Sequence, residues 1–396
     1  RAAMTSSGPM QFYVFHLMPW PYLPNDFDRY ESSSVTFPNS FYDPKRGHKL
    51  YNRYLDELEY AEHLGFDGVC VNEHHQTAYG NMPSPNIMAA MLARRTSRIT
   101  LAIVGNGLPL RGNPLRVAEE VAMIDVTSGG RVISGFVRGI GMEYFGTGVN
   151  PTVSRDRFYE AHDLIVKAWT TPGPFRWIGK HYRYNYVNIW PRPLQQPHPP
   201  IWVPGVGSRE TIEWMAEKEY PYLSVYAPRA QIKSWFDQLR EAYEARGKKA
   251  GLDKIGMLIP IYVDDTDAQA HKEGRQHVMW LFGKGLKMKF EHLMPPGYVN
   301  LQGIRAGLTG RARKPFHEYS YEELLEGGQA IVGSPESVRE QLADVQKELG
   351  FGILCALLHI GDMPHDRTLR NMELFAAEVM PHFRRAAVST AAASST

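Results

Sequence analysis

The fold is decided by the stretch GFDGVCVNEHHQ, residues 65–76. Its centre, 68–71, is a short apolar run of the kind that forms a strand buried on both faces, and polar, titratable side chains follow it directly. In parallel α/β folds, catalytic groups lie where a buried strand reaches its carboxyl end. The stretch therefore predicts a parallel strand that delivers a functional site.

The same pattern recurs along the chain, with longer helical segments between the apolar runs. The predicted strands are 12–17, 68–71, 99–104, 132–136, 201–204, 222–225, 257–263 and 353–358. The predicted helices are 51–64, 86–95, 114–127, 155–169, 210–218, 230–246, 335–349 and 368–383.

Strand followed by helix, eight times in 396 residues, predicts an α/β fold of the closed (β/α)8 TIM barrel type, with insertions at the carboxyl ends of the strands. The alternative is an open, doubly wound sheet. Its usual dinucleotide fingerprint is missing, because Gly205-Val206-Gly207-Ser208 lacks the third glycine.

Three segments do not fit the repeat: 19–47, 172–200 and 280–333. The second contains a predicted hairpin, 175–179 with 182–184. Long loops in a compact domain often cover active sites, and the lysines and glycines of 280–333 argue against a buried core role, so we expect that insertion to be a mobile lid. We expect one domain over 10–385 and flexible tails at 1–9 and 386–396.

The composition limits the class of partner. Hydrophobic residues make up 43%, and charged residues make up 22% with a net charge of +2, which gives no broad field for nucleic acid or an anionic membrane surface. No apolar run approaches the roughly 20 residues needed to cross a bilayer. Cys70 and Cys355 lie in predicted strands and are expected to be buried thiols. These features predict a soluble, cytoplasmic protein with a small-molecule ligand.

Glu73, His74 and His75 are the first candidates for chemistry. Consecutive strand side chains point to opposite faces, so the two histidines cannot share a metal ion, and we expect no metal. The alternative is that one histidine only bonds loop carbonyls. Without a GxSxG motif, a hydrolase triad is disfavoured.

A second set of candidates is suited to an anion. The turn Gly205-Val206-Gly207-Ser208 opens a predicted helix whose first N–H groups, with Thr211 nearby, suit a phosphate. Arg138 and Arg155 could add charge-assisted hydrogen bonds to the same group. The alternatives are an ordinary helix cap at Ser208 and surface ion pairs for the arginines.

From Phe12 to about Phe383 the chain resembles the bacterial luciferase-like flavin-dependent monooxygenases. The most specific match is 65–69 through Glu73-His74-His75. Further matches follow in order: 108–109, 113–116, 118–119, 125 with 128–131, 138–139, 145–146, 332–335, 374–375 and 378–381.

The resemblance implies a (β/α)8 barrel that takes up reduced FMN, reacts it with O2 to a C4a-hydroperoxide (peroxyflavin), and oxygenates a small organic substrate. A separate NAD(P)H:flavin reductase supplies the flavin in such systems. Relatives form dimers through the helices around the second and third strands, so we expect a homodimer.

By position in the family, His74 matches an acid/base histidine and His75 its neighbour. The flavin phosphate is expected at Arg138, Arg155, Gly207, Ser208 and Thr211, and Ser154 and Gly205 are expected as further cofactor-binding residues. A cis peptide without proline is expected at Val104-Gly105 or Gly105-Asn106, beneath the flavin ring. Val137 stands where luciferase has a reactive cysteine, so light emission is not implied.

Two other functions remain open at this stage: a deazaflavin-dependent dehydrogenase on the same barrel, and a non-catalytic flavin-binding subunit. The substrate is not named by any motif. Aromatic side chains at Trp20, Tyr22 and Phe37 could exclude water from the site. An apolar pocket near the insertion is indicated by Met279, Trp280, Phe282, Met288, Phe290 and Met294.

Overall fold

The apolar runs of the sequence form the strands of one parallel sheet. The structure, a computed structural model, describes residues 9–205, 207–299 and 314–384. Eight strands follow one another around the ring in the order β1, β2, β3, β4, β7, β8, β9, β11. They are β1 (Gln11–Phe15), β2 (Gly68–Val71), β3 (Thr100–Gly107), β4 (Val132–Val137), β7 (Ile201–Gly205), β8 (Tyr222–Ser224), β9 (Ile255–Val263) and β11 (Ile353–Leu357).

The ring closes at β1, whose five residues pair in parallel with β11 from Gln11↔Ile353 to Phe15↔Leu357. The strand β8 pairs with β9 in the same direction. The predicted TIM barrel is therefore confirmed, and the open sheet is wrong.

Strand side chains divide between two cores because successive residues point to opposite faces. One core fills the barrel and includes Phe15, Cys70, Ile133 and Leu357. The other lies between the strands and the surrounding helices and includes Val69. Both faces of each strand are thus buried, which explains the continuous apolar runs.

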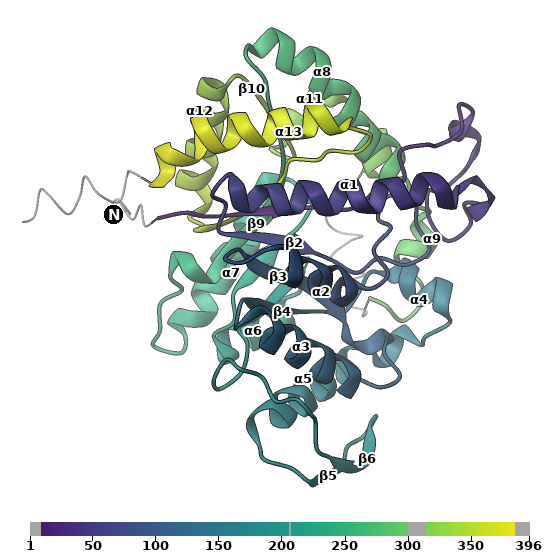
Figure 1. The fold of residues 1–396 in the computed structure, drawn as a ribbon, viewed down its shortest axis with the longest axis vertical. Helices are drawn as coiled ribbons and strands as arrows, with labels where there is room; N and C mark the ends of the chain where they lie inside the picture. The colour runs from purple at the N-terminus through teal and green to yellow at the C-terminus, as the bar shows by residue number, and fades with distance from the viewer. Residues whose placement is uncertain (1–8, 206, 300–313, 385–396) are drawn as a thin grey trace, which may run out of the picture.

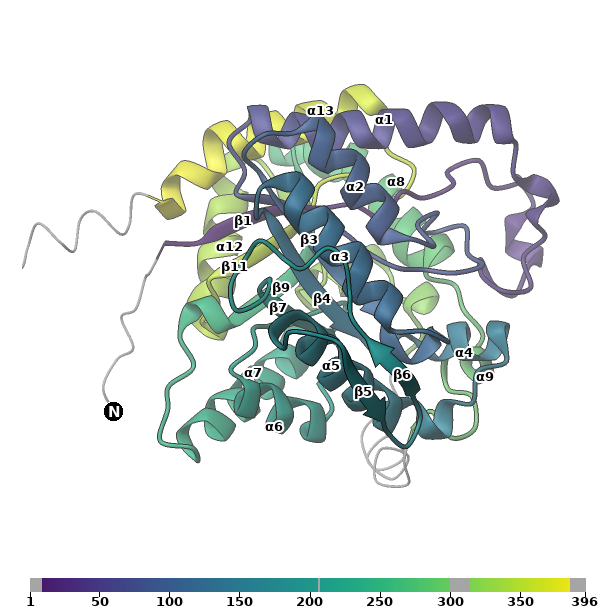
Figure 2. The same cartoon turned by 60° about the horizontal axis from the view of Figure 1, so that its bottom comes forward.

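Helices surround the barrel, as Figures 1 and 2 show. In both views the loop after β1, the helix α4 and the helix α9 lie on the right, whereas the hairpin of β5 and β6 projects at the bottom of Figure 1. The helices are α1 (Pro44–His63), α2 (Pro85–Arg95), α3 (Leu115–Ser128), α4 (Gly141–Thr147), α5 (Ser154–Thr170), α6 (Arg209–Lys218), α7 (Arg229–Glu244), α8 (Asp267–Met279), α9 (Phe290–Leu293), α11 (Tyr321–Glu326), α12 (Pro335–Leu349) and α13 (His365–Leu374).

Most predicted element boundaries agree with the structure to within a few residues, and the helices α4, α9 and α11 were not among the predicted ones. The first helix begins at Pro44 rather than at residue 51, because the side chain of Asp43 caps it by accepting a hydrogen bond from Lys45 N. The last predicted helix begins at His365 and continues as a π-helix over Phe375–Val379. The helix α8, capped by Thr266, was not among the predicted helices.

The hairpin is confirmed as β5 (Phe175–Ile178) and β6 (Arg183–Val187), paired in the antiparallel sense. Inside the insertion, the short strand β10 (Ile331–Gly333) pairs with β9 and was not predicted.

The expectation that the insertion 280–333 lacks a core role is wrong for both of its ends. Trp280, Phe282 and Leu286 are buried at the first end, and Leu324 and Val332 at the second. Apolar side chains therefore anchor the insertion on the barrel despite its lysines. Its residues 300–313, residues 1–8 of the predicted tail 1–9, and the predicted tail 386–396 lie outside the described residues.

Cys70 on β2 and Cys355 on β11 are buried, unoxidised thiols with their sulfurs 3.7 Å apart, as expected for side chains inside the barrel. Over the described ranges, no helix combines the length and the apolarity required to cross a lipid bilayer.

Candidate functional site

The candidate residues gather at the carboxyl ends of the strands, as barrel geometry requires. The strand β2 ends at Val71, and Asn72, Glu73, His74 and His75 follow it directly. The two histidines have different partners. His74 lies next to Tyr79 and Glu143, whereas His75 bonds Glu73.

His74 is held by its Nδ1 atom. The hydroxyl of Tyr79 lies 2.9 Å from Nδ1, and Oε1 of the buried Glu143 lies 3.4 Å from it. The other carboxylate oxygen of Glu143 accepts a hydrogen bond from Ile140 N at the start of α4, which fixes the carboxylate. His74 is 19% exposed, and no described residue bonds its Nε2. The ring is thus oriented on one side and open on the other, as a proton-transferring group must be.

Glu73 has a different environment. Its buried carboxylate accepts hydrogen bonds from His75 Nε2 at 2.8 Å, Arg111 Nη2 at 2.6 Å and Gly107 N at 3.0 Å. Burial alone would raise the pKa of Glu73, but the bond from His75 and the charge of Arg111 hold it below its ordinary value. The bond to Glu73 in turn raises the pKa of His75. Glu73 therefore ties the end of β2 to the end of β3.

The end of β3 forms a tight contact with β4. The Val104–Gly105 peptide is cis, the first of the two predicted bonds. A Cβ atom at Gly105 would lie 2.6 Å from the backbone of Gly135, so only glycine fits there. The next side chain, Asn106, is fully buried, and its Nδ2 makes no hydrogen bond. An unpaired buried donor of this kind calls for a ligand or a water molecule.

Arg138 follows β4 and forms no ion pair with any described carboxylate. Its guanidinium lies over the ring of Tyr298 from the insertion, 4.3 Å from the ring centre, and the Tyr298 hydroxyl donates to Gly139 O at 2.6 Å. The Tyr144 hydroxyl donates to Arg138 O. Within the described ranges, Arg138 is thus a positioned cation with no anionic partner.

Ser154 and Arg155 begin α5 near the same place. The Ser154 hydroxyl is buried and makes no hydrogen bond of normal geometry, and neither does the hydroxyl of Tyr159. Burial raises the pKa of Tyr159, and the nearby Arg155 and Arg138 oppose that rise. Arg155 itself pairs with Glu210 of α6, so its charge is already partly neutralised.

The glycine turn contributes the third part of this set. Gly207 has φ +65°, and a Cβ there would lie 2.3 Å from the ring of Trp235, so glycine is required. Ser208 caps α6: its hydroxyl accepts from Thr211 N at 3.4 Å and lies 2.7 Å from the Thr211 hydroxyl. The cap that we considered as an alternative is therefore present. Residue 206 lies outside the described residues.

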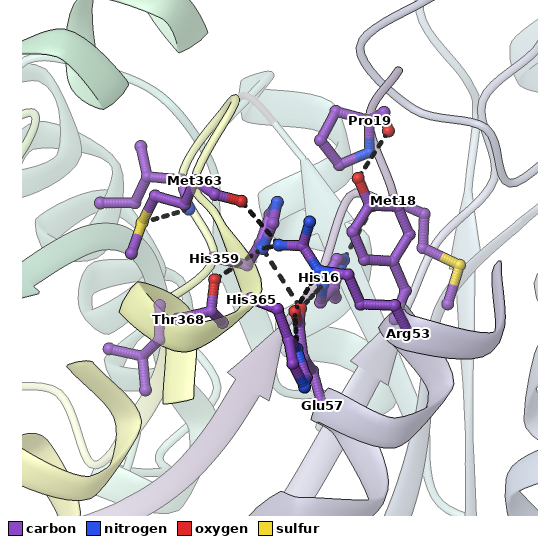
Figure 3. Close-up of polar contacts among 12 residues, drawn as sticks. His16, Met18, Pro19, Arg53, Glu57, His359, Met363, His365 and Thr368 are labelled. Carbon is purple, nitrogen blue, oxygen red and sulfur yellow. Dashed lines mark hydrogen bonds and ion pairs between the residues drawn. The ribbon is translucent and has the colours of Figure 1, made fainter. Parts of the chain in front are cut away.

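A second cluster of histidines lies beside this site, around Glu57 of α1 (Figure 3). Glu57 bonds His16 Nε2 at 2.9 Å, His365 Nδ1 at 2.8 Å and Arg53 Nε at 2.8 Å, and His359 Nδ1 lies 3.2 Å from it. Burial alone would raise the pKa of Glu57, but these partners hold it well below its ordinary value. For His16, burial outweighs the bond to Glu57 and lowers the pKa to about 4.

Three donor atoms of this cluster, on His16, Glu57 and His359, lie within 4.8 Å of one another, which is a spacing that a metal ion could bridge. Two contacts argue for a hydrogen-bonded network instead. Met18 N donates to His16 Nδ1, so His16 Nε2 carries the proton and has no lone pair for a metal. The Arg53 guanidinium lies 3.3 Å from His359 Nδ1 and would repel a cation.

Sequence reasoning missed four residues of the site: Tyr79, Arg111, Glu143 and Tyr298. Tyr79 lies in the loop after β2 and Glu143 in the short helix α4 after β4, so a systematic reading of polar residues after each strand would have included them. Tyr298 lies 159 positions from its partner Gly139, and no local signal indicates that contact.

Known proteins are similar to this chain in sequence and in fold. A family model for luciferase-like monooxygenases matches residues 34–351. The oxygenase component of flavin-dependent trigonelline monooxygenase from Acinetobacter baylyi is 29% identical over 349 residues, which cover 86% of this chain and 92% of that protein.

Two solved structures extend the likeness to the fold. The monooxygenase RslO1 from Streptomyces bottropensis superposes with a TM-score of 0.72 at 25% identity, over 94% of this chain and all of that one. The oxygenating constituent of 3,6-diketocamphane monooxygenase from Pseudomonas putida, solved with FMN, gives a TM-score of 0.72 at 18% identity, over 94% and 99% of the two chains. With the family model covering most of the sequence, the chain belongs to the luciferase-like monooxygenases.

Proposed function

We propose that this protein uses reduced FMN and O2 to oxygenate a small, apolar organic substrate. The proposal rests on one observation above the others: an oriented histidine and an unpaired cation share the same end of the barrel. His74 contacts Glu143 of α4, and Arg138 immediately precedes that helix. The names of the relatives agree, since one is a flavin-dependent oxygenase component and another was solved with FMN.

The residues present fit the phosphate of FMN. Arg138 supplies a positive charge that no described carboxylate neutralises, and Ser154 supplies a buried hydroxyl that makes no hydrogen bond of normal geometry. The capped start of α6 at Ser208 adds backbone N–H groups. Arg155 would have to share its charge between Glu210 and the phosphate. We assign the phosphate to this set, and the flavin ring to the side of Val104, Gly105 and Asn106.

When bound, reduced FMN supplies the electrons that activate O2, and the protein supplies position and proton control. His74 holds or delivers a proton through Nε2, while Tyr79 and Glu143 fix its ring through Nδ1. Tyr298 covers Arg138 and thereby limits the access of water to the phosphate set, which supports a lid role for the insertion 280–333.

We further propose that a separate NAD(P)H:flavin reductase in the cytoplasm supplies the flavin, since the trigonelline relative is named an oxygenase component. A homodimer through α2 and α3 is supported by four apolar side chains on these helices, which are each about half exposed: Ile87, Met91, Met123 and Val126. Met123→Glu should yield a monomer in light-scattering measurements, and an unchanged mass would contradict this interface.

Flavin binding provides the first test. The affinity of reduced FMN and of reduced riboflavin should be measured anaerobically for the protein and for Arg138→Ala. A charge-assisted hydrogen bond contributes roughly 1.5–3 kcal/mol, so the variant should lose about tenfold or more in FMN affinity and almost nothing in riboflavin affinity. Equal losses for both ligands would contradict the phosphate assignment.

Reaction with O2 provides the second test. Mixing the protein–reduced flavin complex rapidly with O2 should give a transient absorbance that free reduced FMN does not give. Reduction of a deazaflavin by a substrate without O2, with no such transient, would instead identify a dehydrogenase.

A further inference from the structure

A large cleft opens beside His74. It has a volume of about 790 Å³, within the range of small-molecule sites. Its walls come from the loop after β1, from the start of α1 and from the loop after β2. The lining residues are Trp20, Ser33, Val35, Thr36, Phe37, Pro38, Asn39, Phe41, Tyr42, Tyr51, His74, Gln76, Thr77, Ala78, Gly80, Asn81 and Pro83.

None of these lining residues is an aspartate, glutamate, lysine or arginine. His74 is the one histidine among them, and the rest are aromatic, aliphatic or neutral polar side chains. Moving a charged ligand from water into such a cleft would remove its hydration without supplying an opposite charge. The lining therefore selects for uncharged ligands.

One wall of the cleft is an aromatic surface. The rings of Phe37 and Phe41 stack with their planes 12° apart and their centres 5.3 Å apart. Phe27 and Tyr30 form T-shaped contacts with Phe37, and Tyr30 also with Phe41. The packed rings of Phe37 and Phe41 give the cleft an apolar aromatic wall, which suits a planar or cyclic ligand.

This wall is held in place from two directions. Val35 N donates to Gln76 O at 2.7 Å, which joins the wall to the loop that carries His74. Ser33 N donates to Lys287 O at 2.9 Å, which joins it to the insertion. The aromatic wall and His74 are thus fixed relative to each other, as a specificity surface next to a reacting group must be.

Trp20 adds a polar feature to this apolar cleft. Its ring is 3% exposed and packs against Tyr42, yet its indole Nε1 is buried and donates to no described group. Among the lining residues that the structure describes, it is the only buried side-chain donor in this condition. An indole N–H can only donate, so the matching ligand atom is an acceptor such as a carbonyl oxygen.

We infer that this cleft binds an uncharged cyclic or aromatic compound that carries a hydrogen-bond acceptor of the ketone type. Phe37 and Phe41 contact its ring, and the Trp20 N–H donates to its oxygen. The inference rests on the proposed oxygenase function, because His74 then faces the bound compound.

Binding to the full-length protein, with and without oxidised FMN, tests this inference by titration calorimetry. Three probes of one shape separate its parts: 2-acetylnaphthalene has ring and acceptor, 2-ethylnaphthalene has the ring alone, and 2-naphthoate has the ring with a negative charge. We expect 2-acetylnaphthalene to bind at least tenfold more tightly than 2-naphthoate. Equal or tighter binding of the anion would overturn the uncharged class.

Variants of the cleft assign the contacts. Trp20→Phe should weaken 2-acetylnaphthalene about three- to tenfold and leave 2-ethylnaphthalene unchanged, since one neutral hydrogen bond is lost. Phe41→Ala should weaken both probes about tenfold, with Phe37→Leu as a milder second variant if Phe41→Ala does not fold. Tyr186→Ala, which removes a ring that is 77% exposed on the hairpin outside the cleft, is the matched control and should change neither affinity.

Unchanged affinities in the Phe41 and Phe37 variants would overturn the assignment of the wall, and equal effects of Trp20→Phe on both probes would overturn the hydrogen bond. These affinities are measured without reduced flavin or O2. The binding results would therefore remain valid if the protein did not oxygenate its substrate. Likewise, the flavin tests would remain valid if the probes did not bind.

Discussion

Two glutamate–histidine clusters lie at the same end of the barrel, and they differ in whether one of their histidines lines a ligand-sized cleft. In the cluster around Glu57, His16 and His359 are buried and point their bonded nitrogens at the carboxylate. In the cluster around Glu73, the carboxylate holds His75, while the neighbouring His74 lines a cleft. Among the described residues of the two clusters, His74 is the histidine that lines this cleft, whereas the unbonded Nε2 of His359 is buried.

The two clusters are directly joined, because Asn72 Nδ2 donates to His16 O at 2.8 Å. Yet their histidines titrate in opposite directions. The pKa of His16 is lowered to about 4, mainly by burial, whereas the bond to Glu73 raises the pKa of His75. The comparison teaches that a histidine near a glutamate indicates function only when one of its nitrogens faces a ligand site.

The largest expected effect concerns the buried cluster. Glu57→Gln removes the charge that Arg53 and His365 face, and breaking one partner of a buried ion pair costs about 3–5 kcal/mol of unfolding free energy. Urea unfolding at pH 7 measures the loss. The control on the same helix is Glu59→Gln, whose partially exposed pair with Arg95 should contribute less than about 1 kcal/mol. Similar losses in both variants would contradict a special role for the Glu57 network.

The next effect is the acid sensitivity of folding. His16 has a folded pKa of about 4 and an ordinary unfolded value near 6.5, so the unfolded chain binds a proton that the folded chain refuses between these values. Stability is therefore complete above pH 6.5 and falls as the pH drops toward 4, by about 3 kcal/mol for this shift. The lowered pKa of Glu57 adds a loss of the same sign below about pH 4.5.

Urea unfolding from pH 7 to pH 4.5 checks this slope. His16→Asn should reduce it, because asparagine can still accept from Met18 N but cannot titrate. His63→Asn, at the exposed end of α1, is the control and should keep the slope of the unchanged protein. Parallel slopes in all three proteins would assign the acid sensitivity to other groups.

The third effect concerns His74, whose replacement should affect turnover rather than folding. His74→Ala should fold and bind reduced FMN, since the phosphate set lies on other strands, but oxygenation should fall by about 10²-fold or more, with O2 diverted to H2O2. His75→Ala should lose less activity and more stability, because it leaves Glu73 with one partner fewer. Product formed per O2 consumed separates the two, and normal coupling in His74→Ala would remove this residue from the mechanism.

The barrel could be predicted from the sequence because each strand is buried on both faces and so appears as an uninterrupted apolar run. His74 could be predicted because it follows such a run directly. The cap at Ser208 was the alternative interpretation of the glycine turn, and the cis bond at Val104–Gly105 was one of two positions implied by the family resemblance.

What could not be predicted depends on contacts between distant parts of the chain. Arg53 and His359 are 306 positions apart, and nothing local to either residue indicates that they meet. The buried ends of the insertion were missed for a related reason: its lysines are conspicuous in the sequence, while Trp280 and Leu324 are buried by contacts with the rest of the fold. Periodicity predicts which face of an element is buried, but not which side chains share a site.

The smallest expected effect concerns Glu143, whose carboxylate lies next to His74 and orients its ring. Glu143→Gln keeps a carbonyl oxygen to accept from Ile140 N, so the start of α4 should remain folded. The amide removes the negative charge 3.4 Å from His74 Nδ1. This contact contributes roughly 1 kcal/mol to holding the orientation of the ring, so its loss should lower the rate of oxygenation about three- to tenfold. Flavin affinity should stay unchanged, and part of the O2 should again appear as H2O2.

The double variant Glu143→Gln, His74→Ala tests whether the carboxylate acts only through the His74 ring. If it does, the double variant should be no slower than His74→Ala alone. Additive losses would show that Glu143 contributes to the reaction independently of His74.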